Sequence, residues 1–416
     1  MLLSVLLALT VIIITARLMG LLFSRLDQPA VIGEVVGGIL LGPSLLGYLA
    51  PGLQAWLLPA DAAPILSVIS QLGVILYMFL VGLELDLTLL RSTVSVTVAI
   101  SAASIVVPFV LGAGLSAAIF EPFSPPGVPF SSFMLFVGVA MSITAFPVLA
   151  RILQDRGLQH THLGTMALTC AAINDAIAWC LLAFVVSVMQ STPAAAVRTV
   201  AWTIAYIAVM LTVGRALVTR IVTRLDTAPH LGERSLALVL VAVLLSAVAT
   251  EFIGIHAIFG AFLLGAILPH RSRVADHVTT RIGDLVRVMF LPVFFAFTGL
   301  RTEIGLVETL SDWTWCAAII AVATFGKWGG TTAAARLLGL DWRTSGALGI
   351  LMNTRGLVEL IVLNIGLDLG VLTPRLFTML VLMAIVTTMM TSPILMAILR
   401  SGGASRADGN LRSYAS

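Results

Sequence analysis

Charged side chains are scarce in this sequence. Only 10% of the 416 residues are Asp, Glu, Lys or Arg, and the 23 basic residues include a single lysine, Lys327. Soluble domains usually carry about 25% charged residues, so an ordinary water-soluble domain is excluded. The net charge of +3 is too small to indicate a nucleic-acid-binding surface, and we expect no nucleic-acid partner.

Cysteines and metal-binding patterns are also sparse. The three cysteines, Cys170, Cys180 and Cys316, stand in apolar stretches without CxxC or Cys/His spacing, so we interpret them as small buried side chains. The chain has no H-E-x-x-H string for a zinc protease, and Asp284 lacks the second aspartate of an aspartyl membrane protease. We therefore predict no enzymatic activity, no cofactor and no resident metal.

Long hydrophobic runs dominate what remains. The chain is 59% hydrophobic with a mean hydropathy of +1.09. Runs of about 17–25 apolar residues can cross a bilayer as helices. We predict an all-α polytopic membrane protein in which residues 1–400 form the transmembrane domain and 401–416 a short flexible cytoplasmic tail. About 13 spans are expected, at roughly 2–24, 31–49, 64–83, 93–119, 130–153, 162–190, 197–219, 234–252, 255–268, 284–300, 314–336, 344–367 and 374–399.

The arginines give this arrangement an orientation. Of the 23 basic residues, 15 lie in one set of alternate loops and the C-terminal tail, three lie in the other set, and five lie within or near spans. Because cytoplasmic loops are enriched in Arg and Lys, the pattern predicts an outside N-terminus and a cytoplasmic C-terminus. The three exceptions are Arg198, Arg301 and Arg375.

Two charged residues stand in the middle of predicted spans. Asp175 follows Asn174 within 162–190, and Lys327 lies within 314–336. A charge at the bilayer centre costs roughly 2.5–3.5 kcal/mol on insertion scales, so such residues usually serve ion or proton pathways. A buried Asp175 can hold a proton or a cation but not both, which is the minimal requirement for exchange. A structural pairing of Asp175 remains the alternative.

The neighbours of these charges have several possible roles. Asn174 either steadies Asp175, helps to coordinate a cation, or joins two helices through its amide. Lys327 is either a counter-charge, a competitor for the carboxylate, or a lysine that extends to the membrane surface.

Two spans are interrupted by residues that break helices. One break runs from Met141 to Pro147 and contains Ser142 and Thr144, whose hydroxyls are candidate cation ligands or ordinary helix-bonded groups. The other runs from residue 351 to 359 and contains Asn353, Arg355, Gly356 and Glu359. Arg355 and Glu359 are spaced i, i+4, so we expect an intramembrane ion pair. Paired broken helices in the two halves of a chain indicate a transporter site and are consistent with inverted repeats.

Other ionisable residues lie near span ends. Glu34, Glu84 and Asp86 are interpreted as structural or gate-lining groups. His256 and Glu251 flank the short ninth run, where the histidine is either a structural side chain or a pH sensor.

Several segments together resemble the monovalent cation:proton antiporter-2 family, and within it the plant-type cation/proton exchangers. The most specific segment is 352–366 (MNTRGLVELIVLNIG), and the resemblance extends over nearly the whole membrane part. The other matching segments are 29–34 (PAVIGE), 42–47 (GPSLLG), 79–86 (FLVGLELD), 142–153 (SITAFPVLARIL), 172–175 (AIND) and 254–262 (GIHAIFGAF).

The resemblance implies a fold and a mechanism. It implies a core of crossed, broken helices that moves against a dimerisation domain in an elevator-like cycle, in a homodimer of the cell membrane. Asp175 matches the family's ion-binding aspartate, Thr144 falls in the unwound segment nearby, and Lys327 matches the family's membrane basic residue. Asn174 at the first position of the pair implies electroneutral exchange of a monovalent cation, K⁺ or Na⁺, for H⁺.

Two other classes of transport protein compete with this interpretation. A transporter of the same fold that carries an organic ion or an exported metabolite would also use crossed broken helices, but it would not need an Asn-Asp pair with a distant lysine. A channel is disfavoured, because the charges are expected to be buried and paired instead of forming rings around a pore.

Overall fold

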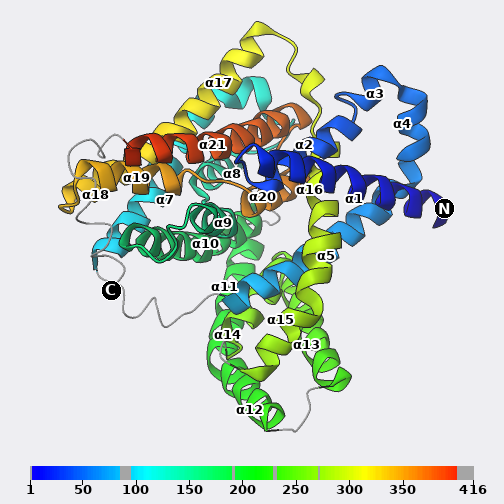
Figure 1. The fold of residues 1–416 in the computed structure, drawn as a ribbon, viewed down its shortest axis with the longest axis vertical. Helices are drawn as coiled ribbons and strands as arrows, with labels where there is room; N and C mark the ends of the chain where they lie inside the picture. Colours follow the sequence, from blue (N-terminus) through cyan, green and yellow to red (C-terminus); the bar gives the residue numbers. More distant parts are fainter. Residues whose placement is uncertain (1, 85–94, 190–192, 228–231, 270–271, 401–416) are drawn as a thin grey trace. The chain divides into compact units, whose positions relative to one another are not determined.

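In the computed structural model, residues 2–84, 95–189, 193–227, 232–269 and 272–400 are described, and every regular element within them is helical (Figure 1). The chain divides into two compact units. Unit 1 comprises Met1–Thr15, Gly52–Arg91 and Trp179–Phe297; unit 2 comprises Ala16–Pro51, Ser92–Ala178 and Thr298–Ser416. Four helices belong partly to each unit: α1 (Leu2–Arg25), α10 (His162–Met189), α16 (Leu291–Leu300) and, by its first residue, α4 (Pro51–Leu57).

Most helices of unit 1 coincide with predicted runs, but α4 (Pro51–Leu57) and nearly all of α15 (Arg273–Leu285) lie outside them. The elements of unit 1 are α4 (Pro51–Leu57), the 3₁₀ turn η1 (Ala60–Ala62), α5 (Ala63–Glu84), α11 (Pro193–Val209), the π turn η2 (Met210–Gly214), α12 (Arg215–Asp226), α13 (Glu233–Ile253), α14 (Ala257–Ile267), α15 (Arg273–Leu285) and the π turn η3 (Val286–Phe290).

Unit 2 contains both interrupted spans. Its elements are α2 (Ala30–Leu41), α3 (Leu46–Leu49), α7 (Ser95–Phe123), α8 (Phe130–Ser142), α9 (Phe146–Asp155), the 3₁₀ turn η4 (Ile304–Leu306), α17 (Leu310–Thr324), the π turn η5 (Phe325–Gly329), α18 (Gly330–Leu337), α19 (Trp342–Met352), α20 (Leu357–Asp368) and α21 (Pro374–Arg400).

Ten helical segments in the described part of the chain are long and apolar enough to cross a membrane, and the bent pair α19–α20 makes an eleventh. The bend between α19 and α20 is 41°. All of the predicted spans coincide with helix, but two are not among these 11 segments. The predicted span 255–268 is α14, which has only 11 residues because a turn at Gly254 (φ +94°) precedes it. The predicted span 314–336 is the helical segment α17–η5–α18, which carries the lysine.

Glycines bring the main helices of unit 1 into close contact. A Cβ atom on Gly82 of α5 would lie 2.3 Å from the carbonyl oxygen of Phe262, and one on Gly265 of α14 would lie 2.2 Å from that of Phe79. Both distances are far below van der Waals contact, so only glycine allows α5 and α14 to approach this closely. Trp179 packs edge-to-face on Phe259, with 5.5 Å between ring centroids.

Unit 2 has a densely packed core around its broken helices. Fully buried side chains of α7, α9, α10 and α19 meet there, among them Ile100, Leu149, Ala171 and Leu348. A Cβ atom on Gly299 would lie 2.2 Å from the carbonyl oxygen of Val35, so α16 and α2 are also in backbone contact. This packing fixes the helices that carry the polar groups.

Candidate functional site

The two interrupted helices of unit 2 are joined at their breaks. The hydroxyl of Thr144, between α8 and α9, donates to the carbonyl oxygen of Met352 at 3.0 Å. The backbone N–H of Ala145 donates to the carbonyl oxygen of Thr354, between α19 and α20, also at 3.0 Å. Backbone groups released by the two breaks therefore satisfy one another within the protein, as polar groups at membrane depth must.

Local sequence explains both breaks. Pro147 stands in the first turn of α9, where its missing N–H needs no partner. Gly356 precedes α20, and a Cβ atom there would lie 2.6 Å from Cγ2 of Val148 on α9. A side chain at position 356 would push the second break away from α9, so the crossing requires glycine.

Asp175 lies on α10 with 3% of its side chain exposed. The N–H of Phe146, at the first residue of α9, and the ammonium of Lys327 act on it electrostatically. Neither carboxylate oxygen has a partner that meets hydrogen-bond geometry in the described part of the chain. A buried carboxylate with two unsatisfied oxygens, beside a helix N-terminus and an ammonium, retains its capacity to bind a proton or a cation.

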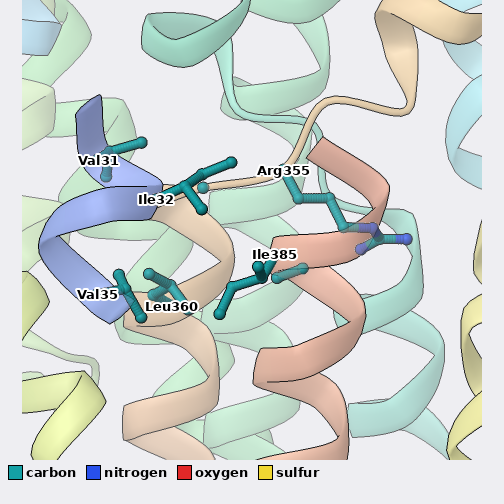
Figure 2. Close-up of a pocket in the computed structure, with 8 residues that line it drawn as sticks. Val31, Ile32, Val35, Arg355, Leu360 and Ile385 are labelled. Atoms are coloured by element: carbon teal, nitrogen blue, oxygen red, sulfur yellow. The ribbon is translucent and has the colours of Figure 1, made fainter. Parts of the chain in front are cut away.

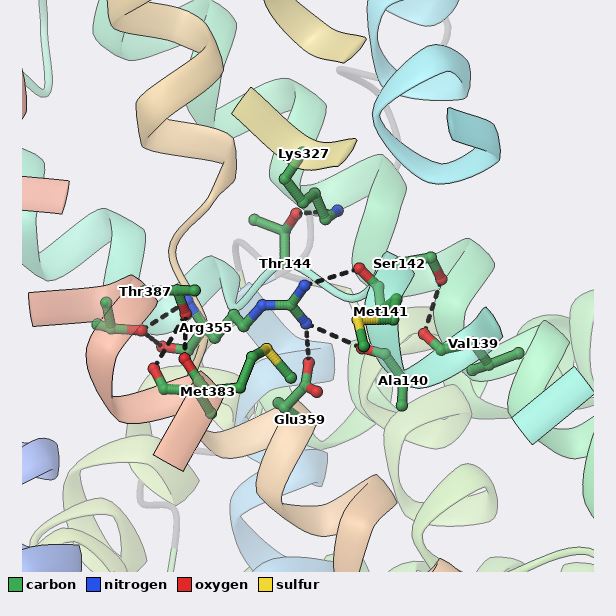
Figure 3. Close-up of polar contacts among 12 residues, drawn as sticks. Val139, Ala140, Met141, Ser142, Thr144, Lys327, Arg355, Glu359, Met383 and Thr387 are labelled. Carbon is green, nitrogen blue, oxygen red and sulfur yellow. Dashed lines mark hydrogen bonds and ion pairs between the residues drawn. The ribbon is translucent and has the colours of Figure 1, made fainter. Parts of the chain in front are cut away.

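Lys327 is fully buried and reaches the first break. Its Nζ donates to Thr144 Oγ1 at 2.6 Å (Figure 3), so the lysine does not extend to the membrane surface. It lies in the π turn η5, and Gly326 and Gly330 on either side pack against Pro108 and Val107 of α7. The glycines around the lysine thus allow its helix to approach α7.

Asn174 is held by three hydroxyl groups. Its Oδ1 accepts from Ser101 at 2.6 Å, and its Nδ2 donates to Ser104 at 2.7 Å and to Thr144 at 3.3 Å. Thr144 therefore accepts from both Asn174 and Lys327 while donating to Met352. Ser142 instead bonds its own helix, at the carbonyl oxygen of Val139 (2.8 Å, Figure 3).

The Arg355–Glu359 ion pair expected from the spacing is present. Both side chains are fully buried, and Nη1 of Arg355 lies 2.6 Å from Oε2 of Glu359. The guanidinium also donates to the carbonyl oxygens of Ala140 (2.9 Å) and Met141 (2.8 Å), the last turn of α8 (Figure 3). Arg355 thus caps the C-terminus of one broken helix from the break of the other, as cations do at helix C-termini.

A small apolar pocket lies on the other side of the second break. Figure 2 shows its lining from α2 and α20–α21, with Val31, Ile32, Val35 and Leu360 labelled. The guanidinium of Arg355 points away from these side chains. None of the side chains that line the pocket carries an oxygen atom, so it is a poor candidate for the ion site.

The remaining candidates lie elsewhere. Glu34 is buried on α2, where Arg17 is the charge that acts on it. His256 is the residue before α14 in unit 1, where the carboxylate of Glu251 accepts from the N–H of Ala257. Glu84 ends α5 but its side chain is outside the described part, as is the whole of Asp86.

Sequence reasoning missed two residues at this site and gave a third a different role. Ser101 and Ser104 are fully buried on α7, and their only sequence signal is a polar stripe with Thr97 at helical spacing. The sequence identifies Asn353 only as part of the second break. It is fully buried, and neither its Nδ2 nor its Oδ1 has a hydrogen-bond partner in the described part. Buried polar groups are nearly always satisfied, so this amide is a candidate to contact an ion or a water molecule.

Crossed broken helices, with a buried carboxylate and an ammonium at the crossing, are typical of secondary active transporters. The family described as "Sodium/hydrogen exchanger, transmembrane" matches residues 11–400, and the chain belongs to this family. The resemblance seen in the sequence is thereby confirmed.

Individual relatives agree with this assignment. The chain is 47% identical to the Na⁺/H⁺ antiporter NhaS4 of Synechocystis sp., over 95% of this chain and 97% of that protein. It is 40% identical to cation/H⁺ antiporter 17 of Arabidopsis thaliana and 33% to K⁺/H⁺ antiporter 1 of Saccharomyces cerevisiae, over 94% and 92% of this chain. It spans about half the length of these two (48% and 45%). These relatives are transporters, not enzymes.

A solved structure shows the same fold. The sodium proton antiporter MjNhaP1 of Methanocaldococcus jannaschii matches with a TM-score of 0.69 at 14% identity, over 96% of this chain and 97% of that one. The all-helical antiporter fold predicted from the sequence is therefore confirmed.

Proposed function

We propose that residues 1–400 form a membrane domain that exchanges a monovalent cation, K⁺ or Na⁺, for H⁺, with one proton moved per cation. The observation that carries the proposal is Asp175, a buried carboxylate beside Lys327 and the two helix breaks, whose oxygens have no partner that meets hydrogen-bond geometry in the described part of the chain. The relatives named as Na⁺/H⁺, K⁺/H⁺ and cation/H⁺ antiporters support the substrate class.

The proposed cycle rests on competition at Asp175. On the side of higher proton concentration the carboxylate takes up a proton, and the site then opens to the other side and releases it. A cation next binds the ionised carboxylate and returns. Besides Asp175, the candidate oxygen ligands are Thr144, Ser142, Asn174 and Asn353. Thr144 and Asn174 already have protein partners, whereas Asn353 has none in the described part, so the amide oxygen of Asn353 is the ligand we add.

The proposed stoichiometry follows from the number of carboxylates. Asn174 cannot carry a second proton, so a site with Asp175 alone exchanges one H⁺ for one cation without net charge movement. Lys327, Arg355 and Glu359 serve as supporting charges in this proposal, and Glu34, Glu84 and His256 stay candidates for gating or pH sensing.

The larger arrangement is also proposed. The division into two compact units supports an elevator-like movement of a core against a dimerisation domain in a homodimer. The arginine distribution supports a multi-pass protein of the cell membrane with an outside N-terminus and a cytoplasmic tail at 401–416.

The test is exchange in proteoliposomes that hold a pH gradient, challenged with Na⁺, K⁺, Rb⁺ or Li⁺, with and without a clamped membrane potential. We expect a cation-dependent collapse of the gradient that is insensitive to the clamp. Asp175→Asn, which keeps the side-chain shape, should abolish exchange and leave folding intact. Asp284→Asn, the same change at an exposed carboxylate, should have no effect.

Each other outcome contradicts a defined part of the proposal. Wild-type exchange by Asp175→Asn would disprove the mechanism. A response that depends on the clamp would disprove the stoichiometry. The absence of any response to alkali cations in the wild type would instead favour an organic ion carried by the same fold.

A further inference from the structure

Two serines of α7 hold the residue next to the exchanging carboxylate. Ser101 and Ser104 lie three residues apart on α7, and both side chains are fully buried. Ser101 Oγ and Asn174 Oδ1 are 2.6 Å apart, and Asn174 Nδ2 and Ser104 Oγ are 2.7 Å apart. The amide is therefore held at both of its ends by α7.

The directions of these hydrogen bonds are determined by the serines. The hydroxyl of Ser104 donates its one hydrogen to the carbonyl oxygen of Ser101 at 2.8 Å, so towards Asn174 its oxygen acts only as an acceptor. The hydroxyl of Ser101 directs its hydrogen to Asn174 Oδ1, with a longer contact of 3.3 Å to the carbonyl oxygen of Cys170. α7 thus presents one donor and one acceptor, which match an amide and do not match a carboxylate.

This pairing separates the roles of the two adjacent residues of α10. The Nδ2 hydrogens of Asn174 are both used, by Ser104 and Thr144, so the amide is committed to the protein. Asp175 keeps both oxygens without a partner in the described part. Because consecutive residues of a helix turn together, fixing the amide also fixes the direction in which the Cα–Cβ bond of Asp175 leaves α10.

We propose that Ser101 and Ser104 are positioning residues of the exchange site. Through the amide of Asn174 they set the rotation of α10 and so the place of the Asp175 carboxylate, and they select an amide over a second carboxylate at position 174. This inference rests on the proposed cation/proton exchange and adds two residues on a helix outside the broken pair.

The consequence differs for the two ions that compete for Asp175. A cation needs the carboxylate and its other oxygen ligands in one fixed arrangement, whereas a proton needs only the carboxylate. If the carboxylate of Asp175 is held less firmly in position, cation binding is therefore weakened more than proton binding. Each tenfold loss of relative cation affinity should move the pH of half-maximal exchange upward by about one unit.

The test compares the double variant Ser101→Ala/Ser104→Ala with Ser116→Ala in proteoliposomes, using Na⁺ and K⁺ as probes. Ser116 is a matched control because it is also buried on α7 but, among the residues that the structure describes, bonds only the carbonyl oxygen of Ala113 on its own helix. We expect the double variant to raise the apparent KM for the transported cation by roughly three- to tenfold, with less effect on the maximal rate and with the predicted upward pH shift. Ser116→Ala should match the wild type.

A second comparison tests whether the serines act through Asn174. If they do, Asn174→Ala and the triple variant Ser101→Ala/Ser104→Ala/Asn174→Ala should have the same KM. Asn174→Ala already removes the amide through which the serines act. A KM and pH profile of the double variant equal to wild type, whatever its stability, would overturn the inference while wild-type exchange upheld the proposed function. A further rise in KM in the triple variant would also overturn it.

If the wild type did not exchange any alkali cation, the proposed function would be wrong, and this inference, which rests on it, would be wrong as well.

Discussion

Thr144 connects three groups of the site in unit 2. It donates to Met352 across the crossing and accepts from Lys327 and Asn174. Since a threonine hydroxyl has one hydrogen and two lone pairs, its bonding capacity is filled. The residue thus ties the ammonium, the amide beside Asp175 and the second break together.

Replacing the hydroxyl of Thr144 should lower both the exchange rate and the stability of the protein. Thr144→Val leaves the buried ammonium of Lys327 without its acceptor, so we expect at least a tenfold loss of exchange and a loss of about 2 kcal/mol of stability. Thr144→Ser, which keeps the hydroxyl, should stay within about threefold of wild type. The measurements are exchange in proteoliposomes and thermal unfolding in detergent.

Thr169→Val is the control, because Thr169 is half-buried on α10 and, among the described residues, its hydroxyl bonds the carbonyl oxygen of Thr165 on its own helix and no other group. Wild-type exchange by Thr144→Val would show that the lysine does not depend on this hydroxyl.

At the residue scale, the sequence located groups that are chemically out of place in a membrane. Asp175 and Lys327 stood out because a charge in an apolar run is rare, and the i, i+4 spacing indicated the Arg355–Glu359 pair. Ser101 and Ser104 did not stand out, because serine is ordinary in membrane helices. Their role exists only through contact with another helix, which spacing along the chain does not report.

At the scale of elements, close backbone contacts decide which helices can pair. Gly82 and Gly265 face one another across α5 and α14, where each Cβ atom would collide with a carbonyl oxygen of the other helix. The sequence indicated the helices by their apolar runs, and the positions of the breaks by Pro147 and Gly356. It did not indicate which glycine contacts which helix, because that depends on tertiary packing.

Adding one methyl group at Gly82 tests the close packing of α5 against α14. In Gly82→Ala the new Cβ atom would lie 2.3 Å from a backbone oxygen, so α5 and α14 must separate, and we expect a loss of about 1–3 kcal/mol. Gly114→Ala on α7 is the control, since no atom lies within 4 Å of its Cβ position. Thermal unfolding of the two purified variants is the measurement, and equal stability would contradict the close approach.

At the scale of the whole molecule, two of the three exceptional arginines are neutralised. Arg301 pairs with Asp368 at 2.5 Å, and Arg375 bonds the carboxylate of Asp312. The hydrogen bond from Arg375 lowers the pKa of Asp312, which precedes the predicted span 314–336, to about 2. This pair stays ionised at neutral and mildly acidic pH, so these arginines do not count against the orientation.

Cysteine labelling in cells tests the orientation. With the three native cysteines replaced, Glu308→Cys should react with a membrane-impermeant maleimide in intact cells, whereas His160→Cys should react only after permeabilisation. Both positions are exposed and lie in loops predicted to be on opposite sides. The reverse labelling pattern would invert the topology, and equal labelling of both in intact cells would contradict the span count between them.

The π turn that carries Lys327 has a consequence for how sequences of this kind can change length. A π turn is an α-helix with one residue inserted, and residues 325–329 form such a turn. Because the wider turn absorbs the extra residue, deleting one residue after Lys327 within it would restore regular helix and leave α18 in nearly the same rotation relative to α17. Gly330 would then still face Val107 of α7, whereas Lys327 would lose the widened turn from which it reaches Thr144. A related chain that is one residue shorter in this turn can therefore keep the packing of α18 on α7 and still present the lysine differently.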